Sequence, residues 1–427
     1  MHDIKRLRQE PGALKASLGR KGFDADIEKA LDLDRRRREA VSEADGLKAE
    51  LNKASRAIGE AKKAGRDAAE EMEAARKIRE RSAELDEERR TVEEELHNLL
   101  LTWPAEPDPN APDGRDETEN VVVHETVMPD AVEFERKDHL TLAESLGILD
   151  MPRGAKIAGS GFPLYLGLGA RLERALINFM LDMQINEHGY TEVLPPFMVN
   201  SSSALGTGQL PKFPEDMYYV ERDDFYLIPT AEVPVTNMHR DEILNAVDLP
   251  IRYAAYTACF RREAGAHGQD TRGLLRMHQF NKVELVQVTT EEASEAAHEE
   301  ILEHATSVLD TLNITYRIVE LCTGDLTFGA ARCYDIEVWA PGTGAWLEAS
   351  SVSNFRDFQA RRMNLRYRPE GGGKPLFAHT LNGSGLATSR LMVALLETYQ
   401  TPEARVIVPR PLQPYMSGVD QIRGRDR

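Results

Sequence analysis

The sequence predicts an α+β protein that begins with an antiparallel pair of long helices. Three observations support this fold class. Apolar residues at heptad spacing run through much of the first hundred positions, which contain few helix-breaking residues. Residues 253–263 and 278–289 are rich in aromatic and β-branched types, as expected of two half-buried antiparallel strands. Amphipathic helical segments alternate with further strand-like segments in the rest of the chain.

Length, charge and cysteine content limit the class of protein. The 427 residues are enough for a large core and two or three domains. A net charge of -18 gives no general sign of nucleic-acid binding, so any RNA contact must come from local basic patches. No signal-peptide core or membrane-length apolar run is present, so we expect a cytoplasmic protein. The three cysteines lack metal-ligand spacing and are expected to be reduced.

A helical hairpin is expected from about Leu31 to Leu101. One coiled-coil seam runs through Ala40, Ala44, Leu47, Leu51, Ala54, Ile58 and Ala61. A second seam, interrupted by Arg89, runs through Ile78, Ser82, Leu85, Val92, Leu96 and Leu99. The turn between them is expected around Gly65, which makes each helix roughly 50 Å long at 1.5 Å per residue.

Two interpretations of this arm are open. It is either a dimerisation coil with a solvated charged surface, which the heptads alone favour, or a projection that grips a polyphosphate. Under the second interpretation the contacting cations are Arg35, Arg36, Lys53, Arg56, Lys62 and Lys63. Residues 104–120, rich in Pro, Asp and Glu, then form a linker between an N-terminal domain (1–103) and a second domain (121–427).

The second domain opens with a helix and an interrupted strand. Residues 171–188 form an amphipathic helix, and residues 189–199 form a strand broken by two prolines, which central strands avoid. Further on, Thr230, Ala231 and Glu232 lie between Pro229 and Pro234, which should hold this short polar segment extended and accessible. The alternative is an ordinary loop.

The strand pair 253–289 contains a cluster suited to phosphate binding. Arg261 and Glu263 point to one side of the first strand, and Phe280, Lys282, Glu284 and Val286 share a face of the second. The connecting loop, 264–277, is unusually long and contains Gly265, Gly268, Gly273, Arg272 and Arg276. A guanidinium on a strand can hold an anion bidentately, and an arginine-bearing loop can close over it. The alternative is a surface hairpin whose charges only pair with one another.

Three further segments complete the domain. Residues 291–312 form an acidic amphipathic helix, and residues 334–354 form two strands around a Pro-Gly turn. On the second of these strands Glu348 and Ser351 form a possible oxygen pair for Mg²⁺. In residues 379–400 a flexible NGSG turn precedes a helix that has Arg390 opposite its apolar stripe.

The motifs resemble one family. FRREAG followed by RGLLRMHQFNKVE resembles motif 2 of class II aminoacyl-tRNA synthetases in the form used by seryl-tRNA synthetases. GLATSR resembles motif 3, the helix and proline-broken strand resemble motif 1, and TAE resembles the serine-binding loop. The resemblance covers essentially the whole chain in family order. The sequence departs at Leu347 and Val352, where an arginine and a cysteine are expected, and at Ala404, where a glycine is expected.

The resemblance implies a fold, an activity and partners. The fold is a six- or seven-stranded antiparallel sheet with flanking helices, in a homodimer whose helical arm reaches the long variable arm of the tRNA. The activity is ATP- and Mg²⁺-dependent attachment of L-serine to tRNA(Ser), and to tRNA(Sec), through seryl-adenylate. The alternatives are a serine-activating paralogue of a secondary pathway and a non-catalytic tRNA-binding regulator, although the latter should have lost its motif arginines.

The resemblance also assigns site residues, with Arg261 and Arg390 as the catalytic pair. The residues implied for ATP are Arg261, Arg262, Glu263, Arg276, Glu348, Ala349, Ser350, Ser351 and Arg390, with Glu348 and Ser351 also holding Mg²⁺. The residues implied for serine are Thr230, Ala231, Glu232, Arg261, Glu284, Asn382 and Ser384.

Overall fold

The structure is a computed structural model that describes residues 1–130, 132–263 and 273–424. The chain forms two compact units, one of Met1–Gly19 with Phe23–Pro104 and one of Arg20–Gly22 with Ala105–Arg427. Three positions singled out in the long loop, Gly265, Gly268 and Arg272, lie outside the described residues. No described helix combines the length and the apolar character needed to cross a bilayer.

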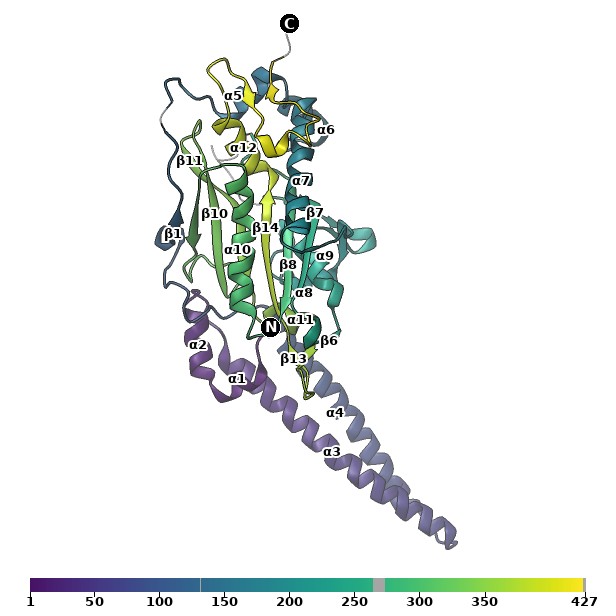
Figure 1. The fold of residues 1–427 in the computed structure, drawn as a ribbon. Coiled ribbons are helices and arrows are strands. Elements are labelled where there is room, and N and C mark those ends of the chain that lie inside the picture. Colours follow the sequence, from purple (N-terminus) through teal and green to yellow (C-terminus); the bar gives the residue numbers. More distant parts are fainter. Residues whose placement is uncertain (131, 264–272, 425–427) are drawn as a thin grey trace. The chain divides into compact units, whose positions relative to one another are not determined.

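The first unit contains the predicted helical hairpin. Its helices are α1 (Ile4–Gln9), α2 (Pro11–Gly19), α3 (Ile27–Lys63) and α4 (Ala69–Leu101). Helices α3 and α4 lie side by side along their length (Figure 1). Gly65 makes the turn with a φ of 68°, a backbone conformation that glycine adopts without strain. The prediction of an antiparallel hairpin with its turn at this glycine is confirmed.

The two heptad seams form the contact between α3 and α4. Ala40, Ala61, Leu85, Val92 and Leu96 are buried, and the remaining seam residues are partly shielded. An ion pair of 3.0 Å between Arg81 Nε and Glu43 Oε1 joins the two helices and gives their register. Near the base of the hairpin an apolar core forms around Leu14, Leu18, Leu33, Leu96 and Trp103.

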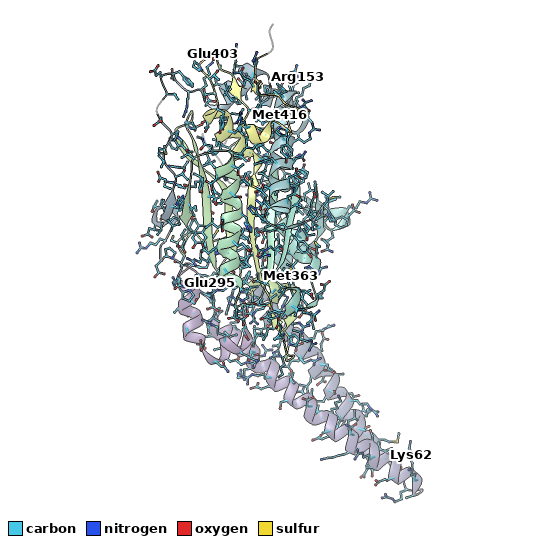
Figure 2. All side chains as sticks on the ribbon, in the orientation of Figure 1. Lys62, Arg153, Glu295, Met363, Glu403 and Met416 are labelled. Atoms are coloured by element: carbon cyan, nitrogen blue, oxygen red, sulfur yellow. The ribbon has the colours of Figure 1, made fainter. Side chains whose placement is uncertain are left out.

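Four of the six predicted tRNA-contacting cations are fully available at the surface of the hairpin. Lys53, Arg56, Lys62 and Lys63 are exposed, and Lys62 projects beside the turn (Figure 2). Arg35 is exposed too, but its guanidinium is held by Asp32 and Glu39 on the same helix. Arg36 is half-buried.

A buried carboxylate ties α1 to α3. The Asp34 side chain is 1% exposed and accepts hydrogen bonds from Arg8 Nε at 2.6 Å and Arg8 Nη2 at 2.9 Å. Arg37 and Arg38, both on α3, each add a hydrogen bond of 3.1 Å. Burial alone would raise the pKa of Asp34, but the hydrogen bonds from Arg8 and Arg37 lower it below its usual value.

Asp34→Asn is expected to lower the free energy of unfolding of the first unit by about 2–3 kcal/mol, because the charged hydrogen bonds to three arginines are lost. The folded-state pKa of Asp34 is depressed, so its contribution is present above the unfolded pKa of about 3.9 and disappears as the pH falls below that value. Urea unfolding followed by circular dichroism at several pH values measures both effects. Asp32→Asn, at an exposed ion pair, is the matched control and should cost less than about 1 kcal/mol.

The second unit consists of helices around one large and several small sheets. Its helices are α5 (His139–Leu146), α6 (Met151–Ala158), α7 (Leu168–Asn186), α8 (Ser201–Thr207), α9 (Glu232–Thr236), α10 (Ser294–Thr311), α11 (Phe358–Met363) and α12 (Thr388–Thr398). Strands of the large sheet are β1 (Val121–Glu125), β2 (Thr191–Glu192), β7 (Ile251–Phe260), β8 (Gln279–Thr289), β9 (Tyr316–Glu320), β10 (Arg332–Ala340), β11 (Ala345–Asn354) and β14 (His379–Ala387). Strands of the small sheets are β3 (Met198–Asn200), β4 (Tyr219–Val220), β5 (Phe225–Leu227), β6 (Ile243–Asn245), β12 (Arg366–Arg368), β13 (Leu376–Phe377), β15 (Val406–Ile407) and β16 (Gln421–Ile422).

The large sheet has the order β1-β9-β10-β11-β14-β8-β7-β2. Seven of its strands are antiparallel to their neighbours, as expected, and the short edge strand β2 adds a parallel pair with β7. One expectation is wrong in detail, because the NGSG segment is not a flexible turn. It lies within β14, a central strand buried between β11 and β8, and α12 follows that strand directly.

Helices cover one face of the large sheet. Helices α7, α10 and α12 lie against it (Figure 1), and the main hydrophobic core forms between them from residues such as Met180, Ile301, Leu285, Ile336 and Leu395. The predicted helices 171–188 and 291–312 correspond to α7 and α10. Because this face is filled with apolar side chains, polar side chains on the central strands are directed to the other face.

Two local expectations differ from the structure. The first strand of the motif 2 pair ends at Phe260, so Arg261 and Glu263 follow the strand, and Glu263 has a φ of 50°. The TAE segment is not extended throughout, because Glu232 already begins α9 and its backbone N–H donates to Thr230 Oγ1 at 3.2 Å.

Ala404, where the family pattern has glycine, has a φ of 56°, a conformation that glycine adopts more easily.

Candidate active site

A cavity of about 820 Å³ lies over the polar face of the large sheet. This volume falls in the range of small-molecule sites. Most of the predicted site residues line it, namely Thr230, Glu232, Arg261, Glu263, Arg276, Glu284, Glu348, Ala349, Ser350, Ser351, Asn382, Ser384 and Arg390. These residues come from segments far apart in the sequence, which the antiparallel ladders bring together.

Alternation along β8 separates the cavity from the core. Lys282 and Glu284 line the cavity, whereas Val283 and Leu285 pack in the helical core. Register then brings the neighbouring strand into place, since Ser384 of β14 lies directly opposite Glu284. The expectation that Arg261 and Glu284 line one pocket is confirmed.

A β-bulge decides where Glu348 and Ser351 point. In a regular strand, residues three apart lie on opposite faces. Here Ile336 pairs with Ser350 and Glu337 pairs with Glu348, so β11 contains one extra residue at Ala349. The extra residue shifts the alternation and lets both oxygen-bearing side chains line the cavity.

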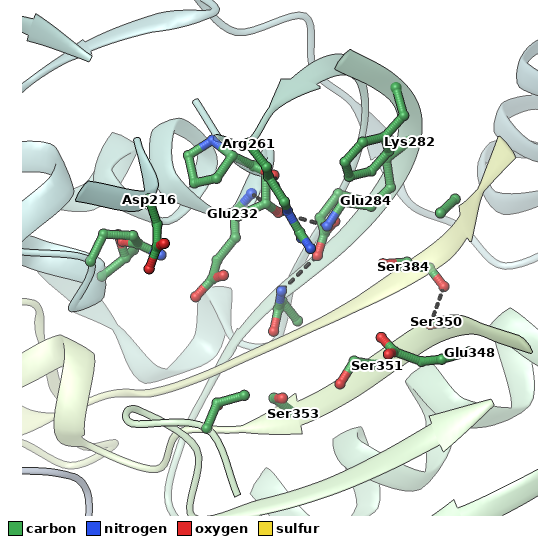
Figure 3. Close-up of a pocket in the computed structure, with 18 of the residues that line it drawn as sticks. Asp216, Glu232, Arg261, Lys282, Glu284, Glu348, Ser350, Ser351, Ser353 and Ser384 are labelled. Carbon is green, nitrogen blue, oxygen red and sulfur yellow. Dashed lines mark hydrogen bonds and ion pairs between the residues drawn. The ribbon is translucent and has the colours of Figure 1, made fainter. Parts of the chain in front are cut away.

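One end of the cavity is a cluster of hydrogen-bonded carboxylates and donors (Figure 3). Lys282 Nζ donates to Thr230 Oγ1 at 2.8 Å and forms an ion pair with Glu284. Asn382 Nδ2 donates to the other oxygen of Glu284 at 2.6 Å. Glu232 lies beside this cluster and is 7% exposed. Burial, followed by the nearby charge of Glu284, raises the pKa of Glu232 to about 7.

Cationic side chains also line the cavity, and Arg261 lies close to the carboxylate cluster. The Arg261 guanidinium lies over the Phe280 ring, 5.2 Å from its centre. The backbone N–H of Arg261 donates to His278 O at 3.0 Å, which extends the β7–β8 ladder by one hydrogen bond. Arg276 Nη1 and Glu263 Oε2 form an ion pair of 3.3 Å. Two guanidinium groups that line one cavity are an arrangement suited to a polyphosphate.

Arg390 and Glu348 both line the cavity and pair with each other. Arg390 Nη1 lies 3.4 Å from Glu348 Oε2 and also donates to the Glu348 carbonyl. Both side chains keep exposed surface, 29% for Arg390 and 48% for Glu348, so each has room for a ligand. Arg390 occupies the third position of α12.

Two predicted ligands do not contribute side chains to the cavity. Ala231 is fully buried in a small apolar cluster. The Arg262 guanidinium lies 5.9 Å from the centre of the Tyr218 ring, and its backbone N–H donates to Asp216 O. Neither residue is among those that line the cavity.

Four residues important to the geometry were not assigned a role from sequence. Lys282 and Phe280 share a strand face with Glu284, so alternation alone was a sufficient signal for them. Asp335 accepts a hydrogen bond of 2.7 Å from Ser351 Oγ, and Gln359 donates to Glu232. No local pattern marks these last two, because both contacts depend on tertiary structure.

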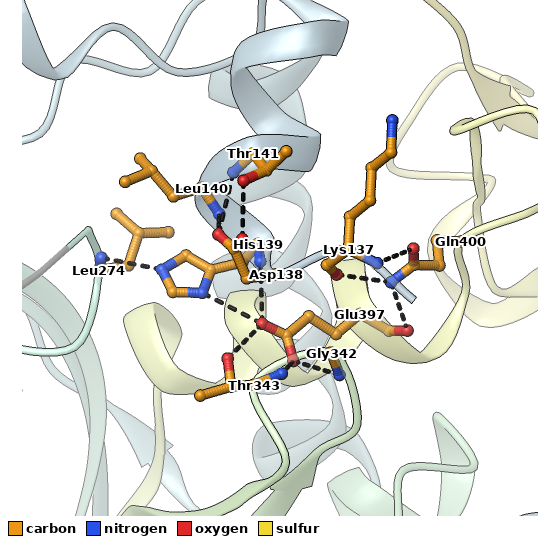
Figure 4. A network of polar contacts seen from close by, with 10 residues as sticks. All are labelled: Lys137, Asp138, His139, Leu140, Thr141, Leu274, Gly342, Thr343, Glu397 and Gln400. Atoms are coloured by element: carbon orange, nitrogen blue, oxygen red, sulfur yellow. Dashed lines mark hydrogen bonds and ion pairs between the residues drawn. The ribbon is translucent and has the colours of Figure 1, made fainter. Parts of the chain in front are cut away.

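A buried network holds the returning end of the motif 2 loop (Figure 4). Leu274 N donates to His139 Nε2 at 3.3 Å, and His139 Nδ1 lies 3.2 Å from Glu397 Oε1. The other oxygen of Glu397 accepts from the backbone N–H groups of Gly342 and Thr343, both at 2.8 Å. Burial opposes ionisation of Glu397, but these hydrogen bonds lower its pKa below the usual value. The network therefore ties the loop end to α5 and α12.

Comparison with known families divides the chain into two matches. Residues 1–107 match the family described as the seryl-tRNA synthetase N-terminal domain. Residues 218–399 match the tRNA synthetase class II core domain of the glycine, histidine, proline, serine and threonine enzymes. The second match contains most of the cavity-lining residues.

Individual proteins are similar over their full length. The serine--tRNA ligase of Chlorobium phaeobacteroides is 52% identical over 427 residues, with 99% of this chain and 100% of that protein covered. The serine--tRNA ligase of Prosthecochloris aestuarii is 53% identical, with 99% of each chain covered. The crystal structure of seryl-tRNA synthetase from Pyrococcus horikoshii complexed with ATP aligns with a TM-score of 0.93 at 38% identity, covering 100% of both chains.

Proposed function

The chain belongs to the seryl-tRNA synthetase family of class II aminoacyl-tRNA synthetases and is a serine–tRNA ligase, and we propose that it joins L-serine to tRNA(Ser) through seryl-adenylate in the cavity described above. One observation carries this proposal. The carboxylates of Glu232 and Glu284 and the guanidinium groups of Arg261 and Arg390 line the same cavity. An amino acid and a nucleoside triphosphate can therefore be held next to each other.

The first step is attack of the serine carboxylate on the α-phosphorus of ATP, with pyrophosphate leaving. Arg261 holds the α-phosphate and Arg390 the γ-phosphate, so positive charge lies where negative charge develops. Glu263 meets the adenine, and Arg276 contacts the nucleotide from the end of the loop. The backbone around Ala349 and Ser350 supports the same ligand. No protein nucleophile is needed, because the chain acts by placement and charge stabilisation.

Mg²⁺ fits the oxygen donors on β11. The Glu348 carboxylate is 48% exposed, and the Ser351 hydroxyl donates a hydrogen bond to Asp335, so its oxygen keeps a lone pair for a cation. Among the described residues no group of three or more histidine, cysteine, aspartate or glutamate side chains forms a metal cage. This agrees with Mg²⁺ held by one or two protein oxygens together with phosphates. Bound there, Mg²⁺ would neutralise phosphate charge.

Serine is selected by hydrogen bonds to its polar groups. Thr230 and Glu232 receive the ammonium group, with the backbone of Ala231 between them. Glu284 and Ser384 take the hydroxyl, and Asn382 holds Glu284 in position. Alanine would leave these buried polar groups unpaired, which excludes it more strongly than an apolar pocket can.

In the second step a ribose hydroxyl of the terminal adenosine of the tRNA attacks the carbonyl carbon of seryl-adenylate, so the seryl ester forms, the acyl–phosphate bond breaks and AMP leaves. We propose that Arg35, Arg36, Lys53, Arg56, Lys62 and Lys63 on the helical hairpin contact the long variable arm, and that tRNA(Sec) is also a substrate. The protein acts in the cytoplasm as a homodimer through α7 and β2. In support of that interface, Leu194 beside β2 is 76% exposed, and a second cavity of about 560 Å³ lies between α7 and β2.

The experiment that tests this function measures two reactions. We expect serine-dependent ATP–pyrophosphate exchange and transfer of labelled serine to tRNA(Ser) and tRNA(Sec) transcripts, both requiring Mg²⁺. Exchange without transfer would point to the paralogue with another acceptor. Loss of both reactions with retained tRNA binding would point to the regulator, although Arg261 and Arg390 both line the cavity and argue against that outcome.

A further inference from the structure

A glutamine outside the assigned ligands contacts Glu232, a buried carboxylate of the cavity. Gln359 lies on α11, is 1% exposed, and its Nε2 donates to Glu232 Oε1 at 2.6 Å. Its side-chain oxygen accepts from Thr380 Oγ1 at 2.7 Å, and Nε2 also lies 3.3 Å from Thr207 O. Gln359 does not line the cavity itself.

These contacts permit only one orientation of the amide. The carbonyl of Thr207 can only accept a hydrogen bond, so the nitrogen of Gln359 must face it. The Thr380 hydroxyl can donate, and it does so to the amide oxygen. The remaining N–H of Gln359 is therefore directed at Glu232, and it cannot be exchanged for an acceptor by rotating the amide.

The other groups around Glu232 do not provide an equivalent donor. Glu284 on β8 faces it with like charge, while Lys282 on β8 and Arg261 after β7 contribute favourable charge from a distance. Lys282 is already bound to Glu284 and Thr230. Among the described residues, Gln359 is thus the one that donates a hydrogen bond to the Glu232 carboxylate.

We infer that Gln359, oriented by Thr380, is a positioning residue that keeps Glu232 aimed into the cavity and ionised for the ammonium group of the substrate. This inference rests on the proposed function, because it assumes that an amino acid ammonium binds at Glu232. In this inference Gln359 affects substrate binding through Glu232 and does not itself contact the substrate.

The groups around Glu232 determine in which direction its pKa changes when the Gln359 donor is removed. Burial and Glu284 raise the pKa of Glu232 to about 7, and the hydrogen bond from Gln359 opposes that rise. Without the donor the pKa of Glu232 rises further, so more of the carboxyl is protonated at neutral pH and cannot pair with an ammonium. Serine binding should then weaken at pH 7 and recover as the pH increases.

The test compares Gln359→Met, which keeps length and removes the donor, with wild type. The measurements are KM for serine, KM for ATP and kcat in pyrophosphate exchange between pH 6 and pH 9. We expect KM for serine to rise about tenfold at pH 7, to approach the wild-type value at pH 9, and KM for ATP to change less than about twofold. Thr380→Val, which frees the amide but leaves it in place, should show the same pattern more weakly.

Gln287→Met is the matched control. Gln287 is also a fully buried glutamine, but its amide contacts Tyr190 and Glu300 away from the cavity. It should lose stability in a thermal melt without a change in the pH dependence of KM for serine. Gln359→Glu should shift the pH dependence furthest, because two buried carboxyls at this distance cannot both ionise.

Two results would overturn the inference. One is an unchanged KM for serine in Gln359→Met, and the other is an increase that is equal at every pH, since a purely structural role gives no pH signature. Serine binding measured by calorimetry over the same pH range separates failure of this inference from failure of the proposed function. If wild type binds serine but shows no exchange, the proposed reaction fails while the role of Gln359 is still decided by the binding curves.

Discussion

Arg261→Ala is expected to lower serine-dependent pyrophosphate exchange by about a thousandfold, the order of loss seen when charge-stabilising donors are removed from a transition state. The reason is its position. The ladder bond to His278 and the Phe280 ring direct the guanidinium into the cavity, and the Arg261 Nε lies 3.4 Å from Pro229 O. Arg261→Lys keeps the charge but loses the planar fork, so a loss of about a hundredfold is expected.

Arg262→Ala is the control for this prediction. It removes the same side chain from the adjacent position, but the Arg262 guanidinium lies against Tyr218 and not in the cavity. Activity should stay within about threefold of wild type if distance from the chemistry decides the effect. Single-turnover adenylate formation measures the step directly. Unchanged exchange in Arg261→Ala would refute the assignment of the α-phosphate contact.

The second large effect is expected from shortening the helical hairpin. Replacing residues 45–79 by a short glycine–asparagine linker should reduce serine transfer to tRNA by at least about a hundredfold, because several phosphate contacts disappear together. Pyrophosphate exchange should stay within about twofold. The design follows the register, since the Arg81–Glu43 ion pair marks where the helices can be rejoined. The core around Leu14, Leu33 and Trp103 stays intact.

A full-length charge variant separates loss of cations from loss of length. Substituting Lys53, Arg56, Lys62 and Lys63 by glutamine leaves both heptad seams unchanged, because all four side chains are exposed. In a plot of the logarithm of the tRNA binding constant against the logarithm of salt concentration, the slope should become shallower by up to about three. Full charging by the shortened chain, with a lower molecular mass in solution, would instead support the dimerisation-coil interpretation.

Features that depend on nearby residues were predictable. The heptad seams, the glycine turn at Gly65 and the amphipathic helix α7 are all visible within short windows of sequence, and the structure confirms each of them. Alternation along β8 likewise assigned Glu284 to the face it occupies. Local periodicity is reliable because a helix or strand buries one side whatever its distant partners are.

Other features depended on strand pairing and could not be read in advance. The NGSG segment looks like a flexible turn because glycine and asparagine favour turns, yet the flanking strands β8 and β11 incorporate it into β14. Glu348 and Ser351 share the cavity only because the bulge at Ala349 shifts the alternation. Both outcomes result from register, which adjacent residues do not encode.

The sequence thus specified the helical hairpin, the order of the motifs and the chemical types that the site requires, since these are properties of short segments. Tertiary structure alone decided which of those side chains meet. It excluded Arg262 from the cavity, paired Asp335 with Ser351, and brought Gln359 on α11 to Glu232 across 127 positions of sequence. The physical reason is that a hydrogen bond requires its two atoms to lie within about 3 Å, and for distant segments only the packed sheet provides that proximity.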